Sequence, residues 1–168
     1  MTSDMILKWD DLVSPTFTPN EYLVQFSENV DLYYKNYEPK KDILNNISVL
    51  LKRKEEKLKI LVLGAVWCPD CTINIPRMIK ITELIPSVIV EFKILYGIVV
   101  NALHKPGEVI WHKNRSPLEA INPKFNLKKI PTFYFFNNAG ELLDVIIEKP
   151  KVNSSLEEEL LEILENQL

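Results

Sequence analysis

Hydrophobic residues in the first third of the chain predict two helices. Between Pro19 and Pro39 an apolar residue recurs every three or four positions, as on one face of an amphipathic helix. The predicted stripe comprises Tyr22, Phe26, Val30, Tyr33 and Tyr37. Thr18, Pro19 and Glu21 together form a start signal for this helix, and a second helix is predicted over residues 41–56.

The rest of the chain alternates between strand and helix patterns. Strands are predicted at 58–66, 87–95, 132–136 and 141–147, and helices at 69–84, from Ser116 and from Ser155 to the end. Pro76 interrupts the 69–84 helix, and residues 96–115 are predicted to be mostly loop. This order predicts an α/β domain over 41–168 with a mixed sheet and helices on both faces, preceded by a helical extension over 1–40 that packs on it.

Charge and composition exclude several classes of protein. The 168 residues carry 20 basic and 23 acidic side chains, and a formal charge of −3 argues against a nucleic-acid partner. No apolar run reaches the ~18 residues that a membrane-spanning helix needs, so no membrane partner is expected. Residues 1–11 lack the pattern of a secretory signal, and we therefore expect a cytoplasmic location.

The two cysteines are the clearest chemical feature. Cys68 and Cys71 lie between a predicted buried strand and a predicted helix, at CxxC spacing. Unpaired N–H groups at the start of a helix favour a thiolate, which makes Cys68 the expected nucleophile. Cys71 lies one helical turn further along, where its sulfur can attack a mixed disulfide formed at Cys68. The spacing therefore predicts thiol–disulfide exchange.

The residues around these cysteines resemble the thioredoxin superfamily. Trp67-Cys68-Pro69-Asp70-Cys71 looks like its active site, and Ile130-Pro131-Thr132 looks like the segment with its cis-proline. Pro76 and Lys93 also match family positions, and the resemblance covers about residues 57–168. The WCPDC sequence is similar to a branch of cytosolic thioredoxin-related proteins.

The resemblance implies a thioredoxin-like three-layer fold and a dithiol reductase of protein disulfides. The electron donor would be of the thioredoxin-reductase type, and no cofactor is expected beyond the redox-active Cys68–Cys71 disulfide. Trp67 and Pro131 would flank the cysteines, and the backbone of Ile130 would pair with an extended substrate segment. Lys93 is a candidate for electrostatic support of the thiolates, or else a solvated strand-end cation.

Two features depart from the family pattern. Thioredoxins have a buried aspartate before the motif, whereas this chain has Val62 and Leu63. Asp70 could accept the proton instead, or could simply be an acid at an early helical position. In addition, 59 residues separate Cys71 from Pro131, which is a longer gap than in ordinary thioredoxins. We hypothesise that the enlarged loop at 96–115 restricts or selects substrates.

Three alternatives compete with the reductase interpretation. His104 and His112 could complete a metal site with the cysteines, although the seven residues between them exceed the usual spacing of about three to five. A glutaredoxin would carry a Gly-Gly pair after the cis-proline region, where this chain has Asn138-Ala139-Gly140, so glutathione use is disfavoured. The third alternative is a binding module in which the dithiol is a redox sensor that regulates a partner without turnover.

Overall fold

A computed structural model describes residues 6–168. Residues 1–5, which begin both the predicted 1–40 extension and the segment without a secretory signal, lie outside the described residues. The helices are α1 (Pro19–Gln25), α2 (Ser27–Lys35), α3 (Lys41–Arg53), α4 (Pro69–Leu84) and α5 (Leu156–Gln167). The strands are β1 (Leu58–Leu63), β2 (Val90–Leu95), β3 (Thr132–Phe136) and β4 (Leu142–Ile147), and three short 3-10 helices are η2 (Trp9–Asp11), η3 (Leu118–Ala120) and η4 (Pro123–Phe125). Across residues 6–168 the longest helices are too short or too polar to cross a membrane.

The four strands form one mixed sheet, as the sequence predicted. Their order is β2-β1-β3-β4; β1 and β2 are parallel, and the β1–β3 and β3–β4 pairs are antiparallel. The central strands β1 and β3 are almost entirely buried because layers cover both faces of the sheet. Since β1 and β2 run in parallel, the chain leaves both strands at the same edge of the sheet.

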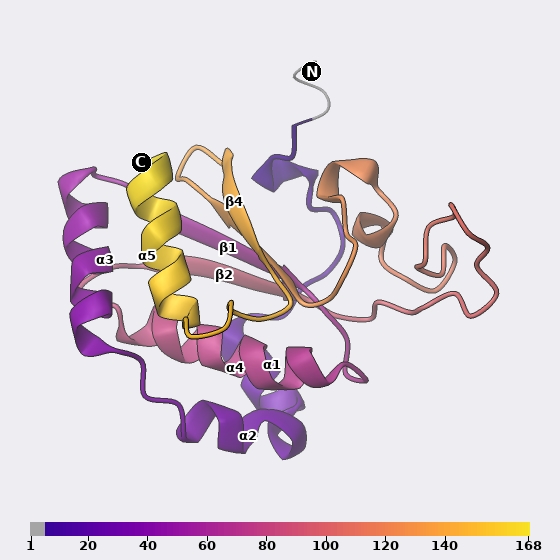
Figure 1. The fold of residues 1–168 in the computed structure, drawn as a ribbon, viewed down its shortest axis with the longest axis horizontal. Coiled ribbons are helices and arrows are strands. Elements are labelled where there is room, and N and C mark those ends of the chain that lie inside the picture. Colours follow the sequence, from indigo (N-terminus) through magenta and orange to yellow (C-terminus); the bar gives the residue numbers. More distant parts are fainter. Residues whose placement is uncertain (1–5) are drawn as a thin grey trace.

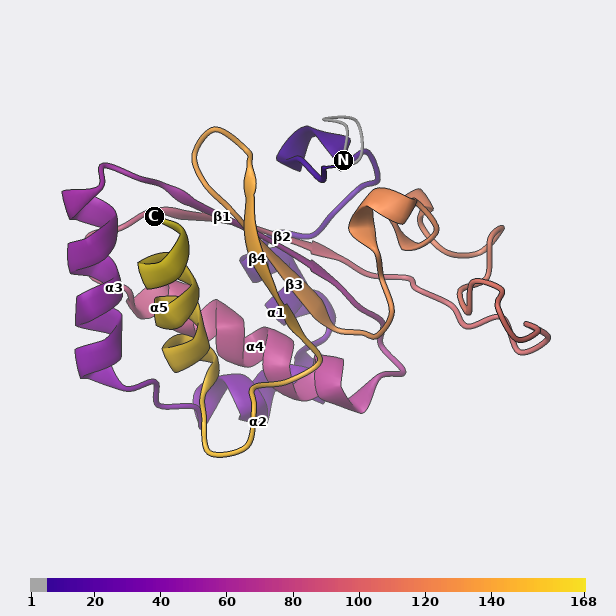
Figure 2. The same ribbon diagram turned by 45° about the horizontal axis from the view of Figure 1, so that its top comes forward.

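Long helices and short helices cover opposite faces of the sheet. Figures 1 and 2 show α3, α4 and α5 together on one side, and η2 with η3 and η4 on the other. The strand register places Lys59, Tyr134 and Phe136 on the face that meets the short helices. There the Trp9 ring lies 5.3 Å from Phe136, and Phe125 lies 5.8 Å from Tyr134. The sheet is therefore a middle layer with helices on both faces.

The predicted single helix over the stripe of tyrosines is in fact two helices. The chain turns at Phe26, which has φ −112° and ψ 21°, so α1 ends at Gln25 and α2 begins at Ser27. The Phe26 ring packs 5.1 Å from Tyr22 and 4.9 Å from Tyr96. A straight helix would extend in one direction only, whereas the break lets α1 pack on β2 and α2 pack on α4. Tertiary packing therefore outweighs the continuous helical pattern.

Other differences from the predicted boundaries are local. Strand β1 ends at Leu63 rather than at residue 66. Strand β2 begins at Val90 rather than at residue 87, because the backbone turns at Ser87, where φ is 57°. Helix α3 ends at Arg53 because the chain enters the left-handed region at Glu55. The predicted short helix from Ser116 consists of η3 and η4, separated at the Asn-Pro pair that the pattern marked as an interruption.

A buried carboxylate fastens the N-terminal segment to the far end of the enlarged loop. Glu119 is buried and accepts backbone N–H bonds from Val13 and Ser14 at 2.8 and 2.9 Å, as well as the Ser14 hydroxyl. Burial alone would raise the pKa of the Glu119 carboxyl, but the bonds from Ser14 and Val13 together hold this pKa below its ordinary value of 4.5.

Glu119→Gln should lower the free energy of unfolding by about 1–3 kcal/mol at neutral pH, because it removes a charged acceptor of buried N–H groups. A carboxyl with a depressed folded-state pKa stabilises the protein above its unfolded pKa and loses that contribution as pH falls through the folded value. The difference from wild type should therefore shrink in urea titrations below about pH 4.5. The exposed Glu108→Gln is the control, and equal stability of the two variants at pH 7 would contradict this role.

Candidate functional site

Cys68 and Cys71 lie at the start of helix α4, at the sheet edge where β1 ends. Five residues connect β1 to the helix, and Cys68 is the N-cap residue, with Pro69 in the first turn. Both cysteines are free thiols; Cys68 is 5% exposed and Cys71 is fully buried. The backbone N–H of Cys71 donates to Cys68 Sγ at 3.2 Å, so the first thiol caps the helix that carries the second.

The surroundings of Cys68 favour its thiolate. The hydrogen bond from the Cys71 side chain is the main reason that the pKa of Cys68 lies below its ordinary value of 9.0. Burial opposes this shift, and the backbone N–H groups of Cys71 and Asp70 support it. The Asp70 carboxylate raises the pKa of Cys68, so the side chain and the backbone of this one residue act in opposite directions.

The surroundings of Cys71 favour its neutral thiol. Burial is the main reason that the pKa of Cys71 lies far above 9.0, and the interaction with Cys68 raises this pKa further. The pKa values of the two thiols therefore differ in the direction that thiol–disulfide exchange requires, with the lower pKa at Cys68 and the higher at Cys71. The close pair therefore combines one thiol whose pKa is lowered with one fully buried thiol whose pKa is raised.

A pair of tyrosine hydroxyls lies on the interior side of the dithiol. Tyr22 and Tyr96 hydrogen-bond through their hydroxyls at 2.5 Å, although they lie 74 positions apart in the sequence. A Cβ on Gly64 would lie 3.0 Å from both Cys71 Sγ and the Tyr96 ring, so Gly64 permits their close approach. Burial raises the pKa of Tyr96 above 10.0, and the hydroxyl stays neutral. The sequence pattern placed Tyr22 on the apolar face of a helix and indicated no role for Tyr96.

The segment that resembles the cis-proline region faces Cys68. The Ile130–Pro131 peptide bond is cis, and the Ile130 carbonyl lies 3.5 Å from Cys68 Sγ, which donates to it. Thr132 is buried and its hydroxyl donates to the Lys129 carbonyl at 2.7 Å, which closes the turn before β3. The structure therefore brings Ile130, Pro131 and Thr132 together with the cysteines.

Trp67 and Asp70 border the cysteines, whereas Lys93 lies elsewhere. Trp67 is 52% exposed, and its indole N–H donates to the Ile98 carbonyl at 2.9 Å. The Lys93 amine lies 5.2 Å from the centre of the Trp9 ring, on the sheet face that the short helices cover. The structure therefore does not bring Lys93 to the thiols, and its cation interacts with an aromatic ring instead.

The two histidines serve the enlarged loop. His112 Nδ1 accepts N–H bonds from Asn114 and Arg115, and His104 Nδ1 contacts the Asn101 carbonyl. Within residues 6–168, His, Cys, Asp and Glu side chains form no group of three or more that could hold a metal ion.

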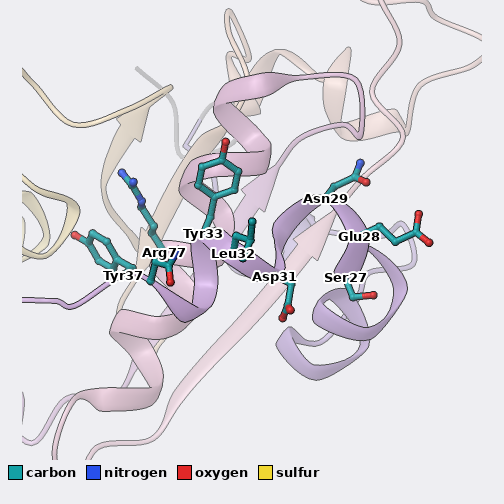
Figure 3. A pocket seen from close by; sticks show the side chains of 9 residues that line it. Ser27, Glu28, Asn29, Asp31, Leu32, Tyr33, Tyr37 and Arg77 are labelled. Carbon is teal, nitrogen blue, oxygen red and sulfur yellow. The ribbon is translucent and has the colours of Figure 1, made fainter.

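A separate pocket of about 590 Å³ lies between α2 and α4. Figure 3 shows Arg77 beside Tyr37, and the Arg77 guanidinium lies 5.1 Å from the centre of the Tyr37 ring. The Asp31 and Glu28 carboxylates point away from Arg77 in that view. The polar groups therefore do not converge on one point, and the dithiol is the candidate site.

The chain is similar to proteins with the same fold. A family model described as thioredoxin matches residues 17–95, which contain both cysteines and also α1 to α3. The match thus begins well before residue 57, where the resemblance in the sequence started. No curated protein shows significant similarity to the chain.

Three solved structures illustrate the likeness. A protein of unknown function from Pseudomonas aeruginosa has a TM-score of 0.56 and 20% identity, covering 98% of this chain and 95% of that one. An HIV epitope scaffold has a TM-score of 0.51 and 21% identity, covering 89% and 86% of the two chains. Fasciola hepatica thioredoxin has a TM-score of 0.40 and 18% identity, covering 73% and 91%.

Sheet topology and paired cysteines define an α/β domain with a redox-type function. The family match over residues 17–95, together with this topology and the paired cysteines, supports an assignment to the thioredoxin superfamily.

Replacing Cys71 should change the reactivity of Cys68. Cys71→Ala removes the main interaction that lowers the pKa of Cys68, so the midpoint of the pH profile for Cys68 alkylation by iodoacetamide should move upward. Cys71→Ser is the matched control, because its hydroxyl can still donate to Sγ and the upward move should be smaller. An unchanged midpoint in Cys71→Ala would contradict the assigned cause.

Gly64→Ala should disturb the interior side of the dithiol. Its methyl group would lie 3.0 Å from Cys71 Sγ and 3.2 Å from Ile75 Cδ1, so overpacking should lower the free energy of unfolding by about 1–3 kcal/mol. Val66→Ile adds the same volume at a half-exposed position next to the motif and should leave stability almost unchanged. Urea unfolding measures the free energy of unfolding of both variants. A Gly64→Ala protein as stable as the wild type would contradict the predicted overpacking.

Proposed function

We propose that the protein is a thiol–disulfide oxidoreductase that reduces protein disulfides through Cys68 and Cys71. The observation that carries the proposal is the asymmetry of the two thiols. Cys68 lies at the rim with a lowered pKa, and Cys71 is buried behind it with a raised pKa. A cysteine pair with only a structural role does not require such a difference in pKa and burial between its two thiols.

The reaction needs two exchanges. The Cys68 thiolate attacks one sulfur of the substrate disulfide, forming a mixed disulfide and releasing the other sulfur as a thiolate that takes up a proton. The Cys71 thiol then loses its proton, attacks Cys68 Sγ and releases the second substrate sulfur, which is protonated in turn. The substrate gains two electrons and two protons, and the protein is left with a Cys68–Cys71 disulfide.

Regeneration requires an external dithiol donor. We propose a thioredoxin-reductase-type partner, with the Cys68–Cys71 pair as the sole redox carrier of this chain. The half-exposed Trp67 ring, which directly precedes Cys68, provides an apolar contact for both substrate and donor. The cytoplasm, where thiols are kept reduced, is the compartment that suits such a reductant.

Turnover separates this proposal from the redox-sensor alternative. With a thiol donor in excess, the wild-type protein should reduce a model protein disulfide through many cycles. In a second assay, pre-reduced Cys71→Ser freed of the thiol donor should stop after one exchange and accumulate a mixed disulfide at Cys68, detected by mass spectrometry of the non-reduced protein. Cys68→Ser, the matched control, should accumulate none. A wild-type protein that oxidises once and does not turn over would refute the reductase and support a sensor.

A further inference from the structure

Basic residues are concentrated in the segment that follows β2. Residues 97–131 carry six lysines and arginines against two acids, although the whole chain has 20 basic and 23 acidic residues. One of the two acids, Glu119, is buried under the N-terminal segment, so Glu108 is the exposed acid of this stretch. Lys124 and Lys129 pair with Asp11 and Glu148. The remaining exposed cations form what we call the basic rim: Lys105, Lys113, Arg115 and Lys128.

Hydrogen bonds connect two segments that carry residues of the basic rim to the residues around the dithiol. The Trp67 indole N–H bonds to the Ile98 carbonyl, which ties the active-site segment to the start of the loop. The Ser116 hydroxyl bonds to both the N–H and the carbonyl of Val99 at 3.0 Å, which brings Arg115 back to the same base. Lys128 lies two residues before Ile130, whose carbonyl faces Cys68. Arg115 and Lys128 therefore lie on the two segments that contact Trp67 and Cys68.

The outer part of the loop extends away from the sheet. Figures 1 and 2 show it projecting outward beyond the edge of the sheet where β1 leads into α4. Three of its apolar side chains are exposed: Val100, Leu103 and Val109, at 41, 87 and 46%. Val66 and Trp67, each 52% exposed, lie directly before Cys68. The surface is apolar beside the thiol and along the loop, with cations around it.

We propose that the basic rim selects disulfides in acidic, extended polypeptide segments, an inference that rests on the proposed reductase function. The disulfide would meet Cys68 beside Trp67, and the flanking residues of the substrate would lie along the loop. The carboxylate of Asp70 disfavours acids immediately next to the disulfide, so the substrate acids belong in the flanks. Opposite charge speeds the encounter and favours one class of substrate without changing the exchange chemistry.

The test uses three peptides that share one disulfide and differ only in their flanks, which contain Glu, Gln or Lys. We expect the reduced wild-type protein to react with the Glu peptide about tenfold faster than with the Lys peptide at low ionic strength. At about 0.5 M salt the rates should converge, because screening acts within a few ångströms. Equal rates for the Glu and Lys peptides at low salt would overturn the proposal.

Two triple variants with the same net charge test whether the preference for the Glu peptide arises from the basic rim. Lys105→Glu/Lys113→Glu/Arg115→Glu should abolish or reverse the preference. Lys52→Glu/Arg53→Glu/Lys54→Glu changes the same charge at the end of α3, beside the opposite end of β1, and should keep the preference. Loss of the preference in both variants would refute the rim, and the single Lys105→Glu variant repeats the test if the triple loop variant unfolds.

The Gln peptide separates failure of this inference from failure of the reductase proposal. If the protein reduces all three peptides at equal rates, the reductase proposal stands and selection by the basic rim is refuted. If it reduces none of them, the reductase proposal fails and the inference fails with it.

Discussion

The hydrogen bond from the Cys71 backbone N–H to Cys68 Sγ joins helix α4 to the redox site, beside the larger lowering of the Cys68 pKa by the Cys71 side chain. It exists because β1 ends five residues before α4 begins, so the chain turns and presents its first helical N–H groups to the thiol. The N-terminal groups of a helix need acceptors, and a thiolate supplies one. This contact therefore caps the helix and also contributes to stabilising the thiolate, and the buried strand β1 fixes its position.

Behind this contact, strand β1 carries two apolar residues at the positions where the family resemblance would imply an aspartate. Val62 and Leu63 are fully buried in β1, and the neighbouring polar groups are the hydroxyls of Tyr22 and Tyr96. Burial raises the pKa values of Cys71 and Tyr96, so both stay protonated at neutral pH. The interior side of the dithiol is therefore neutral in its resting reduced form, and ionisation is confined to the Cys68 side.

Local chemistry was readable from the sequence, whereas contacts across the chain were not. The CxxC motif, the Ile130-Pro131 pair and the buried strands follow from short patterns, because each is defined within a few residues. The break at Phe26 was missed because it depends on packing against Tyr96, far away in sequence. The anchoring of the N-terminal segment by Glu119 was missed for the same reason, since an acid near Pro117 also fits an exposed helical position.

The two hydrogen bonds between the Ser116 hydroxyl and the Val99 backbone, which we call the clasp, bear on which parts of the enlarged loop can differ in sequence. Both bonds of the clasp are made at the base of the loop, outside residues 101–110. A change in the length or composition of that outer stretch leaves Trp67 and Ile98 in register. The dithiol and its supports therefore form one unit of the domain, and the outer stretch of the loop forms another whose sequence can differ without altering the surroundings of the thiols.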